Sequence, residues 1–118
     1  AGSEILHKLR GVQTLNATDA LRLINDQDAW IVDIREGGDY KDGHIPQARH
    51  IPFAALKDRL AELGKAGDKP INVYCRTGTT SQSACVLLKK HGIANVHSLN
   101  GGLPAWQDAH LPVSRKKA

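Results

Sequence analysis

Cys75 is the residue of this chain best placed to do chemistry. It follows a short apolar run at residues 71–74, and a compact polar loop, residues 76–80, separates it from a helical pattern that begins at Ser81. A thiol between the end of a strand and the start of a helix faces unpaired backbone N–H groups and the positive end of the helix dipole. Both favour the thiolate, which is the reactive form of cysteine. The spacing predicts a nucleophile.

The loop after Cys75 carries groups that suit an anionic sulfur. Arg76 supplies a cation that lowers the pKa of a nearby thiol and attracts an anionic donor, unless it is a solvated surface residue. Gly78 lets the backbone approach closely or adopt a positive φ. Three hydroxyls can donate to a bound anion, or serve only the turn: Thr77, Thr79 and Thr80. One hydroxyl of residues 79–81 is expected to cap the helix.

The remaining reactive side chains have a structural interpretation. Cys85 lies in the middle of the same helical pattern beside apolar residues, so we interpret it as a core residue, and we expect both cysteines to be reduced. The six histidines show no ligand spacing and there is no Cys-x-x-Cys, so no metal site is expected. No glycine-rich nucleotide loop is present.

The elements that must position Cys75 alternate along the chain. Nearly continuous apolar runs predict buried strands at residues 29–33, 71–75 and 95–99, with a short strand at 50–52. Helical patterns cover residues 17–24, 53–63, 81–91 and 103–109, while 35–45 reads as a loop. Asn16 is the expected cap of the first helix, and Gly92 ends the helix that follows Cys75. This alternation predicts an α/β fold, a central parallel sheet flanked by helices on both faces.

Length and composition indicate one domain, which we place at residues 13–113, between a flexible lead-in of residues 1–12 and a basic tail of residues 114–118. The net charge of +4 with few aromatic residues argues against nucleic-acid binding. No apolar run is long enough to span a membrane, and reduced cysteines suggest the cytoplasm. Because the chain lacks Met and opens with a tag-like Ala-Gly-Ser, we expect a missing upstream segment, with a membrane anchor as one option.

Four segments in order resemble the rhodanese family of sulfurtransferases. They are the Asp33-Ile34-Arg35 element that closes a strand, the stretch of residues 39–52 with its Gly-His-Ile-Pro core, the Cys75 loop, and the Gly-Gly-Leu-Pro-Ala-Trp ending at residues 101–106. Each would be weak alone. Together they cover about residues 12–113, which is essentially the whole domain.

The resemblance implies the rhodanese fold and a covalent cycle in which a donor such as thiosulfate gives sulfane sulfur to Cys75, and cyanide or a thiol, including a thiol on a protein, removes it. It implies no metal and no organic cofactor. Beyond the loop, Arg35 and Arg49 are candidates to face the pocket and add positive potential. Supporting structural roles are expected for Asp33, Asp39 and Trp106.

The sequence leaves alternatives open for the donor and for the function. Thiosulfate-using members carry a Lys where this chain has Thr77, so the donor stays open. A phosphatase of the same fold needs a longer loop and an Arg six residues after the cysteine, where this chain has Ser81, so that function ranks low. A regulatory binding module is disfavoured because the cysteine is present. The sequence does not distinguish a relay that passes sulfur to one protein partner from an enzyme that acts on small molecules.

Overall fold

A five-stranded parallel sheet forms the centre of the molecule in the computed structural model, which describes residues 12–115. The strands lie side by side in the order β1-β5-β4-β2-β3. Their bounds are Gln13–Leu15 (β1), Trp30–Asp33 (β2), Arg49–His50 (β3), Ile71–Tyr74 (β4) and Val96–Leu99 (β5). The predicted α/β class with a parallel sheet is confirmed.

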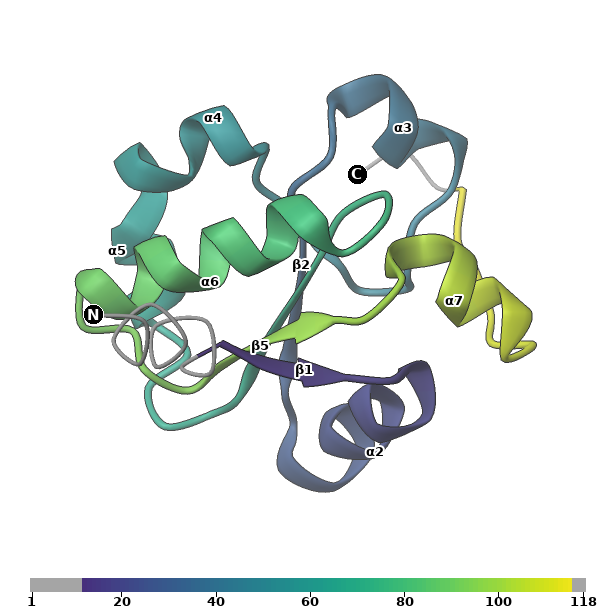
Figure 1. Cartoon of the computed structure of the whole chain (residues 1–118), viewed down its shortest axis with the longest axis horizontal. Helices are drawn as coiled ribbons and strands as arrows, with labels where there is room; N and C mark the ends of the chain where they lie inside the picture. The colour runs from purple at the N-terminus through teal and green to yellow at the C-terminus, as the bar shows by residue number, and fades with distance from the viewer. Residues whose placement is uncertain (1–11, 116–118) are drawn as a thin grey trace, which may run out of the picture.

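Helices cover both faces of this sheet (Figure 1). One face carries α4 (Phe53–Leu56), the 3-10 turn η1 (Lys57–Arg59), α5 (Leu60–Gly64) and α6 (Thr79–Lys90). The other face carries α2 (Ala17–Gln27) and α7 (Gly102–Asp108). The short helix α3 (Gly37–Asp42) leads from β2 towards β3. Across residues 12–115, no helix combines the length and apolar character that crossing a membrane requires.

Alternation along β4 decides on which side of the sheet the reactive cysteine lies. Ile71 and Val73 pack in the core cluster beneath α6, while Tyr74 packs in the cluster beneath α2 and α7. Cys75, two residues after Val73, therefore returns to the α6 side and joins the first cluster. The central position of β4, between β5 and β2, places the thiol over the middle of the sheet edge.

The sequence signals for the ends of two helices are confirmed. The side chain of Asn16 accepts a hydrogen bond of 2.8 Å from the backbone N–H of Asp19, as an N-cap should. Gly92 follows α6 with a φ of 85°. Lys89 and Lys90 occupy the last turn of that helix, where cations complement the dipole.

Other boundaries were predicted wrongly. Residues 35–45 contain α3 rather than loop alone, and the helix expected over 53–63 is divided by the 3-10 turn η1. Strand β1 was not foreseen. Most of the proposed lead-in lies outside the described residues, but Val12 is buried in the core. Ser114, assigned to the tail, forms a two-way backbone bridge with His44.

Candidate active site

Cys75 lies at a cavity of about 290 Å³ formed where the segment after β2, the helices α3 and α4, and the loop between β4 and α6 meet. The residue is only 4% exposed, so the cavity is its route to solvent. Five of the predicted site residues line the same cavity as the thiol: Arg35, Asp39, Arg76, Thr77 and Thr80. The structure thus brings together the cysteine and most of the groups that the sequence associated with it.

The Cys75 sulfur caps helix α6. It accepts hydrogen bonds from the backbone N–H of Gly78, at 3.1 Å, and of Ser81, at 3.3 Å. The helix begins at Thr79, two residues earlier than predicted, and the cap residue Gly78 makes no side-chain cap bond. The predicted hydroxyl cap is therefore wrong. The backbone N–H of Ser81, three residues after the cap residue, is the donor that a capping side chain normally satisfies. Here the Cys75 sulfur accepts this hydrogen bond instead.

This arrangement favours the thiolate. Burial alone would raise the pKa of the Cys75 thiol, but hydrogen bonds from the Ser81 side chain and from loop backbone N–H groups outweigh it and lower the pKa. The Ser81 hydroxyl also donates to the carbonyl oxygen of Gly78 at 3.0 Å. The sequence did not indicate Ser81 as a donor to the sulfur, because a serine in the first helical turn is ordinary as a cap.

Arg35 is held by Asp33 behind the cavity. The guanidinium forms an ion pair of 2.7 Å with the fully buried Asp33 carboxylate and donates to the carbonyl oxygen of Gly43 at 2.6 Å. The Tyr74 hydroxyl donates to the same carboxylate at 2.7 Å and accepts from the backbone N–H of Ile45 at 3.0 Å. The pair therefore ties residues 43–45 to the ends of β2 and β4, and much of the charge of Arg35 is neutralised there.

The mouth of the cavity is acidic as well as basic. Glu36 and Asp39 line it beside Arg76, and within residues 12–115 neither carboxylate forms an ion pair. Asp39, expected to support the structure, thus stands at the opening. Phe53 lines the same mouth and is 39% exposed. With Arg35 paired to Asp33, one cation and two carboxylates remain to act on an incoming substrate.

Arg49 does not reach this cavity. Its guanidinium lies over the ring of Trp30, 3.8 Å from the ring centroid, and lines a different hollow beside Gln47. A cation over an indole face is a favourable pairing in its own right. The idea that Arg49 faces the pocket is therefore wrong.

The other predicted site residues have separate places. Thr79, the first residue of α6, is exposed and lies outside the cavity lining; its hydroxyl is 3.5 Å from that of Thr77. Gly78 contributes its N–H and adopts the positive φ, 103°, that the sequence anticipated. Trp106 is buried on the opposite face of the sheet, where its indole N–H donates to the carbonyl oxygen of Pro112 at 2.7 Å.

Cys85 differs from Cys75 although both are free thiols. It is fully buried in the core beneath α6, and burial raises its pKa to about 12. A buried thiol of high pKa is inert towards external reagents. Its interpretation as a core residue agrees with this placement.

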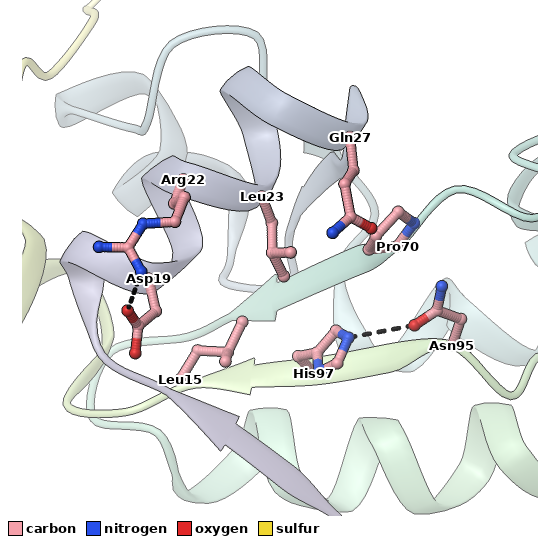
Figure 2. A pocket seen from close by; sticks show the side chains of 8 residues that line it. All are labelled: Leu15, Asp19, Arg22, Leu23, Gln27, Pro70, Asn95 and His97. Atoms are coloured by element: carbon pink, nitrogen blue, oxygen red, sulfur yellow. Dashed lines mark hydrogen bonds and ion pairs between the residues drawn. The ribbon is translucent and has the colours of Figure 1, made fainter.

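A second hollow, of about 510 Å³, lies on the α2 side of the sheet (Figure 2). Two pairs of its polar side chains contact each other: Asp19 with Arg22 at 3.6 Å, and His97 with Asn95 at 3.1 Å. None of the 8 residues that line it is a cysteine, and Figure 2 shows Leu23 and Gln27 of α2 extending towards the strands that carry Leu15 and His97.

Comparison with known proteins finds relatives of similar length. The family model of the rhodanese-like domain matches residues 16–109, which include β2, the Cys75 loop and α7. Among curated proteins, a sulfurtransferase of Allochromatium vinosum is 36% identical over 92 residues, covering 78% of this chain and 84% of that protein. Thiosulfate sulfurtransferase GlpE of Coxiella burnetii is 36% identical over 96 residues, covering 81% of this chain and 87% of that protein.

Solved structures show the same fold. A Rhodopseudomonas palustris protein, RPA3614, superposes with a TM-score of 0.81 at 28% identity, covering 92% of this chain and 89% of that one. That protein is described as one of unknown function and a possible tyrosine phosphatase. The fold therefore accommodates more than one suggested chemistry, and the loop around the cysteine has to decide between them.

Proposed function

The chain belongs to the rhodanese family of sulfurtransferases, and we propose that Cys75 is its covalent sulfur carrier. The observation that carries the proposal is the pair of backbone N–H groups, from Gly78 and Ser81, that point at the Cys75 sulfur. They hold an anion at that atom without any side-chain base. The Thr77 and Thr80 hydroxyls at the cavity can bind the donor or the outer sulfur of the persulfide.

The proposed reaction has two displacement steps. In the first, the Cys75 thiolate attacks the outer sulfur of thiosulfate; the sulfur–sulfur bond of the donor breaks, sulfite leaves with the electron pair, and Cys75 becomes a persulfide. In the second, cyanide or a thiolate attacks the outer sulfur, the bond to Cys75 breaks, and the Cys75 thiolate is regenerated. Charge and sulfur balance in both steps, and no oxidant, metal or organic cofactor is needed.

The short loop favours sulfur over phosphate. From Cys75 to Ser81 the chain offers two N–H groups to one atom, and Arg76 is the one cation of the loop. A phosphatase has to bind three phosphate oxygens, for which a bidentate Arg is the effective group. Position 81 instead holds a buried Ser. We therefore propose sulfur transfer rather than phosphate ester hydrolysis.

The proposal is tested by loading and unloading the protein. Incubation with thiosulfate should add one sulfur to the intact mass, and cyanide should then remove it as thiocyanate. Cys75→Ser should do neither, whereas Cys85→Ser should do both. Turnover in Cys75→Ser, or a wild-type protein that never gains sulfur, contradicts the proposal, and release of phosphate from an aryl phosphate would support the phosphatase instead.

The acceptor is the second part of the test. A relay that serves one protein partner should load with sulfur normally but discharge slowly to cyanide and to small thiols. Fast discharge of sulfur to cyanide and to small thiols supports an enzyme that acts on small molecules. In either case the protein is expected to act where cysteines stay reduced, as the cytoplasm allows.

A further inference from the structure

Two buried serine hydroxyls lie in contact beneath the Cys75 loop. Ser81, in the first turn of α6, and Ser98, in the middle of β5, are both fully buried, and their hydroxyl oxygens are 2.6 Å apart. The strand residues around Ser98 are mainly apolar. A hydroxyl in such surroundings is costly unless it is hydrogen-bonded, so the partners of these two groups have to be identified.

The distances assign the direction of the bond between them. The Gly78 carbonyl oxygen lies 3.0 Å from the Ser81 hydroxyl but 3.5 Å from that of Ser98. If Ser98 donates to Ser81, Ser81 keeps its own proton for a partner at good distance. The reverse direction would leave Ser98 with only the longer contact. Ser98 is therefore the donor of the pair.

The proton of Ser81 then has two acceptors on the same loop. In the structure the hydroxyl donates to the Gly78 carbonyl oxygen at 3.0 Å. The second acceptor is the neighbouring Cys75 sulfur, which accepts the backbone N–H of Ser81 at 3.3 Å and whose pKa the Ser81 side chain lowers. A thiolate attracts a hydroxyl proton more strongly than a carbonyl oxygen does, because a hydrogen bond to an ionised group is stronger. Ionisation of Cys75 should draw the Ser81 proton towards the sulfur.

We propose that Ser98 is a positioning residue for the nucleophile: it donates to Ser81, and Ser81 in turn donates to the Cys75 thiolate. When Ser81 turns towards the sulfur, the Ser98 hydroxyl keeps the Ser81 oxygen bonded and polarises it, and it lies within reach of the Gly78 carbonyl oxygen that Ser81 leaves. Ser98 touches no substrate. It acts through Ser81 on the charge of the sulfur.

The consequence for sulfur transfer rests on the proposed function. In the discharge step, the acceptor attacks the outer sulfur of the persulfide, and the electron pair of the broken bond passes to the Cys75 sulfur. A better stabilised thiolate leaves faster. In the loading step at high pH, where all the thiol is ionised, the same stabilisation makes the sulfur a slightly weaker nucleophile. Loss of the Ser98 hydroxyl should therefore change the two steps in opposite directions.

The test measures the pKa of Cys75 from the pH dependence of its alkylation by iodoacetamide, which needs no sulfur transfer. Ser81→Ala, which removes the direct donor, should raise the pKa by about one unit or more. Ser98→Ala should raise it by about half a unit; because the less acidic thiolate is also slightly more nucleophilic, alkylation well below the midpoint should slow about twofold. The double variant should match Ser81→Ala, because Ser98 acts only through Ser81.

Controls separate this role from a general loss of packing. Val96→Ala removes buried side-chain volume from the same face of β5 and should leave the Cys75 pKa unchanged. Exposed Ser83 on α6 provides a matched control for loss of a hydroxyl. The charged groups that share the cavity with Cys75 are unchanged in every variant: Arg35, Glu36, Asp39 and Arg76.

The outcomes are distinct from those that test the proposed function. The inference is overturned if Ser98→Ala leaves the pKa unchanged, or if it still raises the pKa when Ser81 is already Ala. Above the midpoint, Ser98→Ala should alkylate up to about twofold faster while the loaded protein discharges sulfur more slowly. Slowing of both steps would also contradict it. A wild-type protein that takes up no sulfur would refute the proposed function. The alkylation result would still decide whether Ser98 acts on the pKa of Cys75.

Discussion

Gly102 provides the sharpest prediction about how the Cys75 loop is held. A Cβ at this position would lie 2.3 Å from the carbonyl oxygen of Cys75 and 2.6 Å from both the carbonyl carbon and oxygen of Arg76. All three are backbone atoms of the reactive loop, so no side chain can rotate away. The next residue, Leu103, donates its N–H to the Cys75 carbonyl oxygen at 3.2 Å. The start of α7 and the loop are thus in backbone contact.

Gly102→Ala combines two costs. The residue has a φ of 63°, where any L side chain costs roughly 1–2 kcal/mol. The added methyl must also push the loop back by about 1 Å, and forcing a methyl group into a packed site costs typically about 1–3 kcal/mol. We therefore expect a loss of about 2–5 kcal/mol in the free energy of unfolding. Because a misplacement of about 1 Å can reduce a catalysed rate about 100-fold, sulfur transfer should fall by a similar factor.

Gly67→Ala is the matched control. Gly67 has a φ of 62°, nearly that of Gly102, but a Cβ there would meet nothing within 4 Å. Urea unfolding should show a loss of only about 1–2 kcal/mol for this variant, with sulfur transfer unchanged. The difference between the two variants isolates the contact with the loop. If Gly102→Ala is no less stable than Gly67→Ala and retains its rate, the backbone contact does not hold the loop as described.

Three further predictions concern charge. Arg35→Ala leaves a buried carboxylate unpaired and should lower the free energy of unfolding by about 3–5 kcal/mol in urea; a loss below 1 kcal/mol would contradict the bracing role. Glu36→Gln combined with Asp39→Asn should speed loading from thiosulfate several-fold at low ionic strength and less in high salt, and equal rates at low salt would rule out repulsion at the mouth. Because the pKa of Cys75 is lowered, its alkylation should rise with pH and level off with a midpoint below the ordinary thiol value of about 8.5; a midpoint at or above that value refutes the capping argument.

The sequence predicted the elements whose signals are local. Residues 71–74 are all buried, as their continuous apolar pattern predicted. Asn16 and Gly92 predicted two helix ends, one through its side-chain cap and the other through its positive φ. Strand β1 has no such signal. It is short and largely exposed, and it exists because it pairs with β5, in register from Gln13 opposite His97. Pairing of this kind is a tertiary property that periodicity cannot report.

Helix α3 was missed because two glycines at its start read as helix breakers. What fixes this segment is its fourth residue, Tyr40, whose ring stacks between His44, at 3.9 Å between centroids, and His50, at 4.5 Å. The three rings come from separate elements, so their contact follows from the fold. The fold also explains why the prediction for Arg49 was wrong. A residue on an edge strand can direct its side chain to either face of the sheet, and the contact with the Trp30 ring decides which face Arg49 takes.

The site shows the same division at finer scale. The sequence marks Cys75 as a thiol at a helix start, but the atom that caps the helix belongs to the residue before the loop, so hydroxyl-based capping rules pointed to the wrong group. The contact of Ser98 with Ser81 could not be predicted from the sequence for a related reason. Ser98 lies 17 residues after Ser81 in the chain, on a strand with no unusual sequence signal, and only the packing of β5 beside β4 brings it under Ser81. The nucleophile can be predicted from its neighbours in the chain, whereas the groups that tune its charge belong to neighbours in space.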